Sequence, residues 1–94
     1  MNNKPKTIIV CAALRKDDLI ITGPRHFDGI MRAQIRAILG DDAKKFAYAE
    51  QGFVDQFGNF WNRIDAMILA RASGQPLDMK RNGHKTELFS EGLY

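Results

Sequence analysis

Cysteine is the scarcest reactive residue in this 94-residue chain, which carries Cys11 alone. One cysteine excludes an internal disulfide framework of the kind that stabilises many small extracellular domains. Cys11 lies inside the apolar run 9–13, so we expect a buried, inert thiol in a reducing compartment. A Cys–His nucleophilic pair would need that thiol exposed beside a base, and we do not predict one.

Long hydrophobic runs are also missing. The run Ile8–Leu14 spans only seven residues, whereas a membrane-spanning helix needs about 20. It ends in the charged residues 15–18 and does not resemble a secretory signal. We therefore predict a cytoplasmic protein with no membrane partner.

Clusters of catalytic or metal-binding residues are absent as well. His26 and His84 are far apart in the sequence, and a metal site needs several suitable ligands at a fitting spacing. The eight glycines form no phosphate-binding or dinucleotide-binding motif. The carboxylates fall in expected turns and helix caps. We therefore predict a binding protein that is not an enzyme, with no metal site and no cofactor.

The net charge of +3 is small and unevenly distributed. Four basic or potentially basic residues lie in one short stretch: Arg25, His26, Arg32 and Arg36. This concentration favours an anionic partner, but it is sparser than the basic patch of a typical nucleic-acid-binding protein.

The chain length fits a single domain, residues 1–94, with residues 1–5 as a flexible arm. Four apolar segments predict strands that pair as two hairpins: Thr7–Leu14 with Leu19–Thr22, and Gln51–Val54 with Asn59–Trp61. Residues 41–50 are ambiguous between a loop and a helical turn. Residues 88–94 are apolar enough to dock on the domain.

A helix is predicted after each hairpin. Asp28 and Asn62 are suitable N-caps, and Asp65 gives the second helix the pattern of a capping box. The apolar positions expected to face the core are Phe27, Met31, Ile35, Ile38 and Leu39 in the first helix and Ile64, Met67, Ile68 and Ala72 in the second. The order ββα-ββα predicts an α+β fold, a small antiparallel sheet with two helices on one face.

The turn before the first helix is a candidate anion site. It delivers Arg25 and His26 to a helix start, where free backbone N–H groups attract anions. Arg25 adds a guanidinium that can hold a phosphate. Asp28 would compete for the same donors, and a solvated arginine beside a packed histidine explains these residues somewhat better.

The aromatic residues of the second hairpin are the other candidate. Phe60 and Trp61 are consecutive in a strand and must face opposite sides of the sheet. An exposed ring beside Asn62 and Arg63 would suit a nucleobase, by stacking and edge hydrogen bonds. Aromatic packing across the sheet and at a subunit interface is the favoured alternative. A domain this small has a modest core, so we expect a homo-oligomer, a dimer or larger.

Several short motifs occur in a fixed order along residues 23–94. They are Gly23-x-Arg25-His26, Gln51-Gly52-Phe53, Gly58-x-Phe60-x-x-Arg63-x-x-Ala66, Gly74-Gln75 and Leu88-Phe89-Ser90-Glu91-x-Leu93-Tyr94. The series resembles a set of phage-encoded small proteins, and it is similar to the Thoeris anti-defence sponges. Those proteins form oligomers that sequester cyclic ADP-ribose isomers without cleaving them.

This resemblance implies a function and a site. The chain would bind a small anionic nucleotide, a cyclic ADP-ribose isomer or a cyclic dinucleotide, in the cytoplasm of an infected bacterium. The resemblance places the ligand on Arg25, Phe53, Asn62 and Arg63, with His26 nearby, and the aromatic argument adds Phe60. Gly92 departs from the pattern, which usually has an acidic residue there.

Two alternatives stay open. The first is a phage inhibitor that acts on a host defence complex, such as a CRISPR or restriction complex, through protein–protein contact. The second is a nucleic-acid binder that uses Arg25, Arg32 and Arg36.

Overall fold

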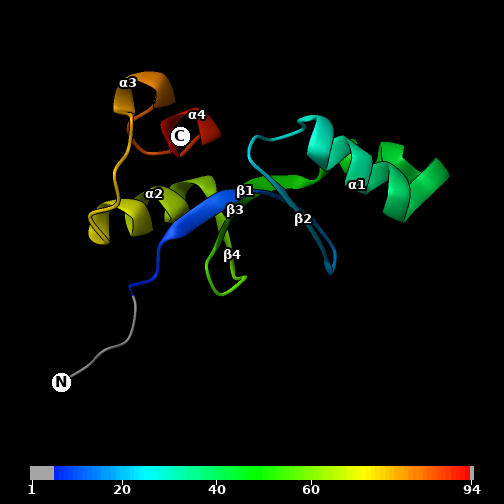
Figure 1. The fold of residues 1–94 in the computed structure, drawn as a ribbon, viewed down its shortest axis with the longest axis horizontal. Coiled ribbons are helices and arrows are strands. Elements are labelled where there is room, and N and C mark those ends of the chain that lie inside the picture. The colour runs from blue at the N-terminus through cyan, green and yellow to red at the C-terminus, as the bar shows by residue number, and fades with distance from the viewer. Residues whose placement is uncertain (1–5, 94) are drawn as a thin grey trace.

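The computed structural model describes residues 6–93, so the predicted arm at residues 1–5 lies outside the described residues. The α+β prediction is confirmed (Figure 1). The elements, in chain order, are β1 (Ile9–Lys16), β2 (Leu19–Gly23), α1 (Gly29–Leu39), the 3₁₀ helix η1 (Gly40–Tyr48), β3 (Glu50–Asp55), β4 (Phe60–Asn62), α2 (Arg63–Ala72), α3 (Met79–Asn82) and α4 (Ser90–Leu93). Both predicted hairpins and both predicted helices are among them.

The described strands form one antiparallel sheet in the order β2-β1-β3-β4. The pairing of β1 with β3 joins the two hairpins at the centre of the sheet. The first turn is shorter than the predicted four residues, because Arg15 and Lys16 pair with Ile20 and Leu19 and extend the ladder. Asp17 takes a positive φ of 54° to close the turn, a conformation that aspartate tolerates better than most residues.

One hydrophobic core lies between the sheet and the helices. Ala12, Leu14, Ile21 and Phe53 supply the sheet side. The helices add Met31 and Ile35 from α1 and Ala66, Met67 and Ala70 from α2.

Four of the predicted core positions are wrong, because Ala72 is exposed as well as three isoleucines. Ile38 is 56% exposed, and Ile64 and Ile68 are 52% and 61% exposed. Helix α2 instead buries the face that carries Ala66, Met67 and Ala70. Small alanine side chains let this helix approach the sheet closely, so its bulky isoleucines are left on the outside.

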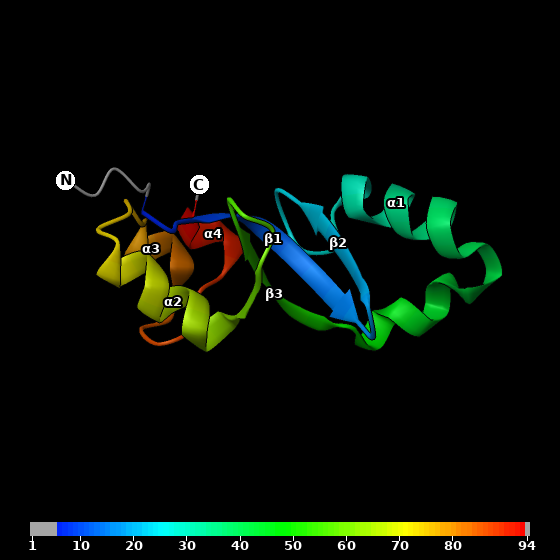
Figure 2. The ribbon, with the colours of Figure 1, turned by 90° about the horizontal axis from the view of Figure 1, so that it is seen from below.

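The ambiguous segment 41–50 lies largely within η1, which is anchored by Phe46 at 2% exposure. Figure 2 shows α1 and the green segment after it at one end of the molecule, with α2, α3 and α4 at the other. Among residues 6–93, no helix is long and apolar enough to cross a membrane.

The C-terminal segment docks beside α2. Leu88 is fully buried, and its backbone N–H donates to the carbonyl oxygen of Arg63 at 2.9 Å. Asn82 is a buried polar hub whose amide donates to the carbonyls of His84 and Glu87 and whose oxygen accepts from the backbone N–H of Phe89. Gly92 is packed against it: a Cβ there would lie 2.5 Å from the Cβ of Asn82. An acidic residue at position 92 would therefore require Asn82 to move.

Candidate functional site

The turn that carries Arg25 and His26 is shaped by Asp28. The carboxylate of Asp28 accepts hydrogen bonds from the backbone N–H groups of Met31 at 2.8 Å and Arg25 at 3.2 Å. The predicted N-cap of α1 is therefore confirmed. The carboxylate occupies donors that an anion at the helix start would need, so the turn does not offer the anion site that the sequence allows.

His26 is held against β3. Its Nε2 atom lies 2.7 Å from the carbonyl oxygen of Gly52, and its ring meets Phe53 in a T-shaped contact with centroids 5.2 Å apart. Burial lowers the pKa of His26, and the positive charge of Arg63 adds to the effect, while the Gly52 carbonyl and Glu91 oppose it. A neutral imidazole that donates its Nε2–H to Gly52 accounts for this geometry.

Arg25 ties the same turn to the C-terminal segment. Its Nη1 atom donates to the carbonyl oxygen of Ser90 at 2.9 Å and to that of Pro24 at 3.3 Å. Ser90 is 2% exposed. Part of the guanidinium that was expected to hold a phosphate therefore holds α4 in place.

Arg63 is the most fully engaged of the predicted residues. Its Nη1 atom donates to the carbonyl oxygen of Leu88 at 2.9 Å, its Nη2 atom donates to Oε1 of Gln51, and its guanidinium stacks 4.2 Å from the ring centroid of Phe89. Burial lowers the pKa of Arg63, and the negative charges of Glu87 and Glu91 partly offset this decrease. The guanidinium is thus a half-buried junction between β3, α2 and the C-terminal segment.

Asn62 caps α2 as predicted. Its side-chain oxygen accepts from the backbone N–H of Asp65 at 2.8 Å, and its amide donates back to the Asp65 carboxylate at 3.2 Å. Asn62 and Arg63 also line an open cavity of about 320 Å³. The other residues that line this cavity are Glu50, Gln51, Ile64 and Glu87.

The two predicted aromatic residues lie on opposite faces of the sheet. Phe53 pairs with Trp61 and has 0% exposure, so its ring is a core residue with no surface for a ligand. Phe60 lies on the other face, where its ring covers Gly52 and the guanidinium carbon of Arg15 lies 4.2 Å from its centroid. The expectation that Phe60 and Trp61 face opposite ways is confirmed.

Asp55 fixes the turn between β3 and β4. Its carboxylate accepts from the backbone N–H groups of Phe57 and Asn59, from the Asn59 amide and from the indole N–H of Trp61. Trp61 is thereby held on the core side of the sheet. Phe57, in the turn itself, is 60% exposed, so its ring is the aromatic surface that this hairpin presents to solvent.

The structure brings four of the six predicted site residues toward one end of the sheet. Arg25, His26 and Arg63 each bond to a backbone carbonyl of another motif, and Asn62 and Arg63 share the cavity. Gln75 makes a comparable long-range contact outside the motifs, because its amide makes two hydrogen bonds with the backbone of Ile9 in β1. Several of the ordered motifs therefore meet in space. The ring of Phe53 contacts His26 from within the core, whereas Phe60 lies on the opposite face of the sheet.

Sequence reasoning gave no role to Gln51, Glu87, Phe89 and Ser90. Three of them belong to the motif series, so the series itself carried the signal, but no periodicity or local pattern shows which side chain each would meet. Glu87 carried no signal, since a carboxylate in a polar segment is ordinarily solvated.

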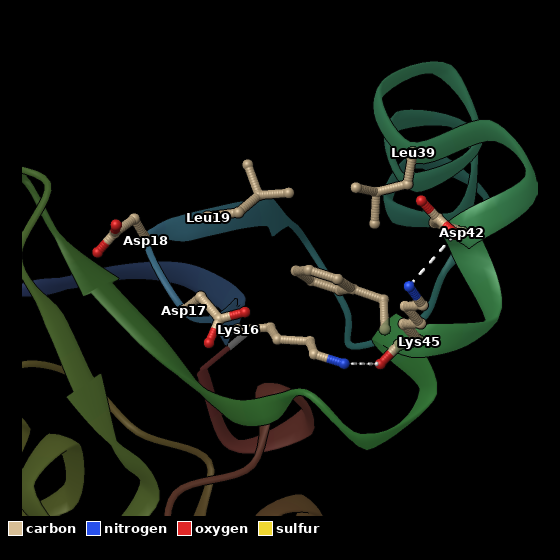
Figure 3. Close-up of a pocket in the computed structure, with 8 residues that line it drawn as sticks. Lys16, Asp17, Asp18, Leu19, Leu39, Asp42 and Lys45 are labelled. Atoms are coloured by element: carbon tan, nitrogen blue, oxygen red, sulfur yellow. Dashed lines mark hydrogen bonds and ion pairs between the residues drawn. The ribbon is translucent and has the colours of Figure 1, made fainter.

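A larger cavity of about 460 Å³ is lined by residues that belong to none of these motifs. Leu19, Leu39 and Phe46 line its apolar part. Figure 3 shows two interactions among its charged residues: Lys45 pairs with Asp42 at 3.5 Å, and Lys16 donates to the carbonyl oxygen of Lys45 at 2.8 Å. This cavity contains none of the predicted site residues.

Residues 6–93 contain neither an activated cysteine nucleophile nor a group of metal ligands. Cys11 is half-buried rather than buried, and it lies on the sheet face away from the core. Burial raises the pKa of its thiol, against weaker effects of Thr22 and Gly23, so the reactive thiolate is disfavoured. Within the described residues, no group of three histidine, cysteine or acidic side chains is placed to hold a metal ion.

Comparison with known proteins identifies the family. A family model described as the phage T4 y16D protein matches residues 8–94, nearly the whole chain. No curated protein and no solved structure matches the chain. The matched region includes every motif described above, from Gly23 to the C-terminal segment. The chain belongs to the phage T4 y16D protein family.

Proposed function

We propose that this chain is a phage anti-defence protein that binds and sequesters a cyclic nucleotide immune signal, either a cyclic ADP-ribose isomer or a cyclic dinucleotide, without cleaving it. It would act in the cytoplasm of the infected bacterium, where such a signal accumulates. The family membership agrees with a phage origin, and the similarity of the motif series to the Thoeris anti-defence sponges suggests the ligand.

One observation carries the proposal. The guanidinium of Arg63 and the amides of Gln51 and Asn62 lie together at an open cavity of about 320 Å³. Two of the five N–H groups of the Arg63 guanidinium are bonded to Leu88 and Gln51, and the others would meet a phosphate. Amide groups suit the edge of a base. The cavity volume lies at the lower end of the range for small-molecule sites.

The cavity rim also carries the carboxylates of Glu50 and Glu87, which would repel a phosphate unless their charges are offset. Glu50 forms an ion pair with Arg15 at 2.8 Å, which offsets its charge. Glu87 lies 3.4 Å from Nε2 of His84. Both carboxylates can also accept hydrogen bonds from the ribose hydroxyl groups of a nucleotide.

The cavity is too open for one chain to enclose a cyclic nucleotide. Ile64 lies on its rim and is exposed. A second copy of the chain packed on α2 would cover this side and exclude water, so the proposed function includes a homo-oligomer.

The experiment is a thermal-shift panel of cyclic ADP-ribose isomers and cyclic dinucleotides, followed by denaturation and chromatography of the released ligand. At least one compound should raise the melting temperature and be recovered intact. Linear ADP-ribose serves as the matched control ligand. Release of a cleaved product over several turnovers, or no stabilisation by any compound, would contradict the proposal.

Asn62→Ser tests the cavity itself. Serine keeps a capping oxygen for α2 but removes the amide donor, and it avoids placing a second carboxylate beside Asp65, as Asn62→Asp would. We expect the ligand-free protein to melt almost like the wild type, with a roughly two- to tenfold loss of affinity. Lys80→Gln, an exposed change in α3, is the control.

A second candidate function is inhibition of a host defence complex through protein–protein contact. The observation that favours it is the pair of exposed isoleucine stripes, Ile30 and Ile38 on α1 and Ile64 and Ile68 on α2. Exposed apolar patches on small proteins often mark interaction surfaces. Co-purification with one defined host complex, abolished by Ile64→Glu, would favour this function over signal binding.

A further inference from the structure

A third concave surface lies at the end of the molecule opposite α2, α3 and α4. It is a groove of about 280 Å³ between α1 and η1, the pair of elements at the end marked by α1 in Figure 2. Its floor is apolar and its rim is cationic. The lining residues are Phe27, Ile35, Ala43 and Phe46 on the floor, Ala47 at its exposed edge, and Arg32, Arg36 and Lys44 on the rim.

The rim charge is uncompensated. No acidic residue lines the groove, and within residues 6–93 none of Arg32, Arg36 and Lys44 forms an ion pair. Arg32 and Arg36 are four residues apart on one helix, a spacing at which like charges destabilise the helix. The larger cavity in Figure 3 differs, because its rim combines two lysines with three aspartates.

The floor is already formed in the absence of any ligand. Phe46 is 2% exposed and Ile35 is 6% exposed, so both are anchored in the core. Phe27 has a positive φ of 55°, and its backbone N–H donates to the sulfur of Met31 at 3.2 Å. A preformed apolar floor lowers the ordering cost of binding.

We propose that this groove binds a small amphipathic acid, with an aromatic or aliphatic body on the floor and a phosphate or carboxylate head group at Arg32, Arg36 and Lys44. The charge complementarity determines the sign of the head group. The small volume favours a single small molecule over a helix of a partner protein. The groove shares no residue with the cavity at Asn62, so this inference does not depend on the proposed function.

The test uses 1-naphthyl phosphate as the probe, with 2-naphthoate for the carboxylate source, and equilibrium dialysis as the measurement. Both anions should bind and should shift the amide resonances of residues 27–47. Neutral 1-naphthol and inorganic phosphate should each bind at least about tenfold more weakly, since each supplies one half of the recognition. If 1-naphthol bound as tightly as 1-naphthyl phosphate, the cationic rim would not contribute to recognition. If inorganic phosphate bound as tightly, the apolar floor would not contribute. Either result would overturn the proposal.

Variants separate the rim from the floor. Arg36→Gln and Lys44→Gln should each weaken 1-naphthyl phosphate binding roughly two- to fivefold, the range for exposed charge pairs. Ala47→Phe fills the exposed edge of the groove and should abolish binding without changing any charge. Lys80→Gln removes the same charge at the opposite end of the molecule and should change nothing.

Folding of each variant is checked by its melting curve before binding is measured. Unchanged affinity in the folded double variant Arg36→Gln/Lys44→Gln would refute the site. Sedimentation with anionic lipid vesicles but no binding of free 1-naphthyl phosphate would show that the surface meets membranes and that the small-molecule proposal is wrong.

Discussion

The Nε2 atom of His26 lies 2.7 Å from the carbonyl oxygen of Gly52, and this contact joins the first motif of the chain to the second. Burial lowers the pKa of His26 below its ordinary value of 6.5. At a pH between the folded pKa and about 6.5, the unfolded chain therefore holds a proton that the folded chain lacks. The free energy of unfolding must then decrease as the pH falls from about 6.5 through the folded pKa.

His26→Gln should remove this part of the pH dependence, because glutamine can still donate to Gly52 but does not titrate. Urea unfolding at pH 7.5, 6.5 and 5.5 measures the effect. His84→Gln changes an exposed histidine and serves as the control. A His26 resonance that titrates above pH 6.5 by NMR would contradict the assignment.

Arg63→Lys tests the junction with the C-terminal segment. Lysine cannot donate to both Leu88 and Gln51 while stacking on Phe89, so we expect a loss of about 1–2 kcal/mol in the free energy of unfolding. Amide hydrogen exchange of residues 84–93 should accelerate. Arg71→Lys, which affects one exposed contact with Lys85, should cost less than about 0.5 kcal/mol. Equal effects of the two changes would mean that Arg63 is an ordinary surface residue.

Asp55→Asn tests the turn between β3 and β4. In the variant, an NH₂ group would replace the carboxylate oxygen that accepts from the indole of Trp61 and from the amide of Asn59. Both donors would then face a third donor and lose their acceptor. We expect a loss of about 2–4 kcal/mol in the free energy of unfolding, measured in urea at pH 7. Asp18→Asn, in the exposed turn after β1, is the control.

The carboxylate of Asp55 should also make the free energy of unfolding depend on pH. Burial alone would raise the pKa of Asp55, but the hydrogen bonds from Trp61, Asn59 and Phe57 outweigh it and lower the pKa. The stabilisation is therefore present above the unfolded pKa of about 3.9 and is lost as the pH falls through the folded pKa. The Asn variant should lose less stability than the wild type between pH 5 and pH 2.

Self-association is expected at α2. Ile64 and Ile68 are one turn apart and exposed, and a partner that covers them would also close the cavity beside Asn62. Sedimentation at micromolar concentration should report a dimer or larger, and Ile64→Glu/Ile68→Glu should give the 10.6 kDa monomer. Ile30→Glu/Ile38→Glu on α1 is the matched control. A monomeric wild-type protein would disprove the expectation.

Local interactions explain why much of the fold was predictable. The N-caps Asp28 and Asn62 bond to backbone groups three residues away, so a short window of sequence contains the whole cause. The hairpins are similarly local. By contrast, α2 carries apolar side chains on two faces, and nothing within the helix says which face meets the sheet.

The sequence could predict which residues belong to the candidate site, but not which contacts they make. The sequence identified Arg25, His26, Asn62 and Arg63, but it could not show that the first two and Arg63 bond to the backbone of other motifs. It also placed Phe53 and Phe60 together, whereas strand alternation separates these rings onto opposite faces of the sheet. Phe53 does contact His26, but its ring is buried in the core.

The sequence by itself determined the order of the four strands and of α1 and α2, the starts of these two helices and the mildly basic charge, because each depends on neighbouring residues or on composition. It did not predict α3 and α4. The tertiary structure decided which isoleucines are exposed, which arginines are engaged and where the apolar grooves lie. Those properties depend on contacts such as Arg25 with Ser90, across 65 residues of chain. Long-range contacts form only when the whole core packs, so no local pattern records them.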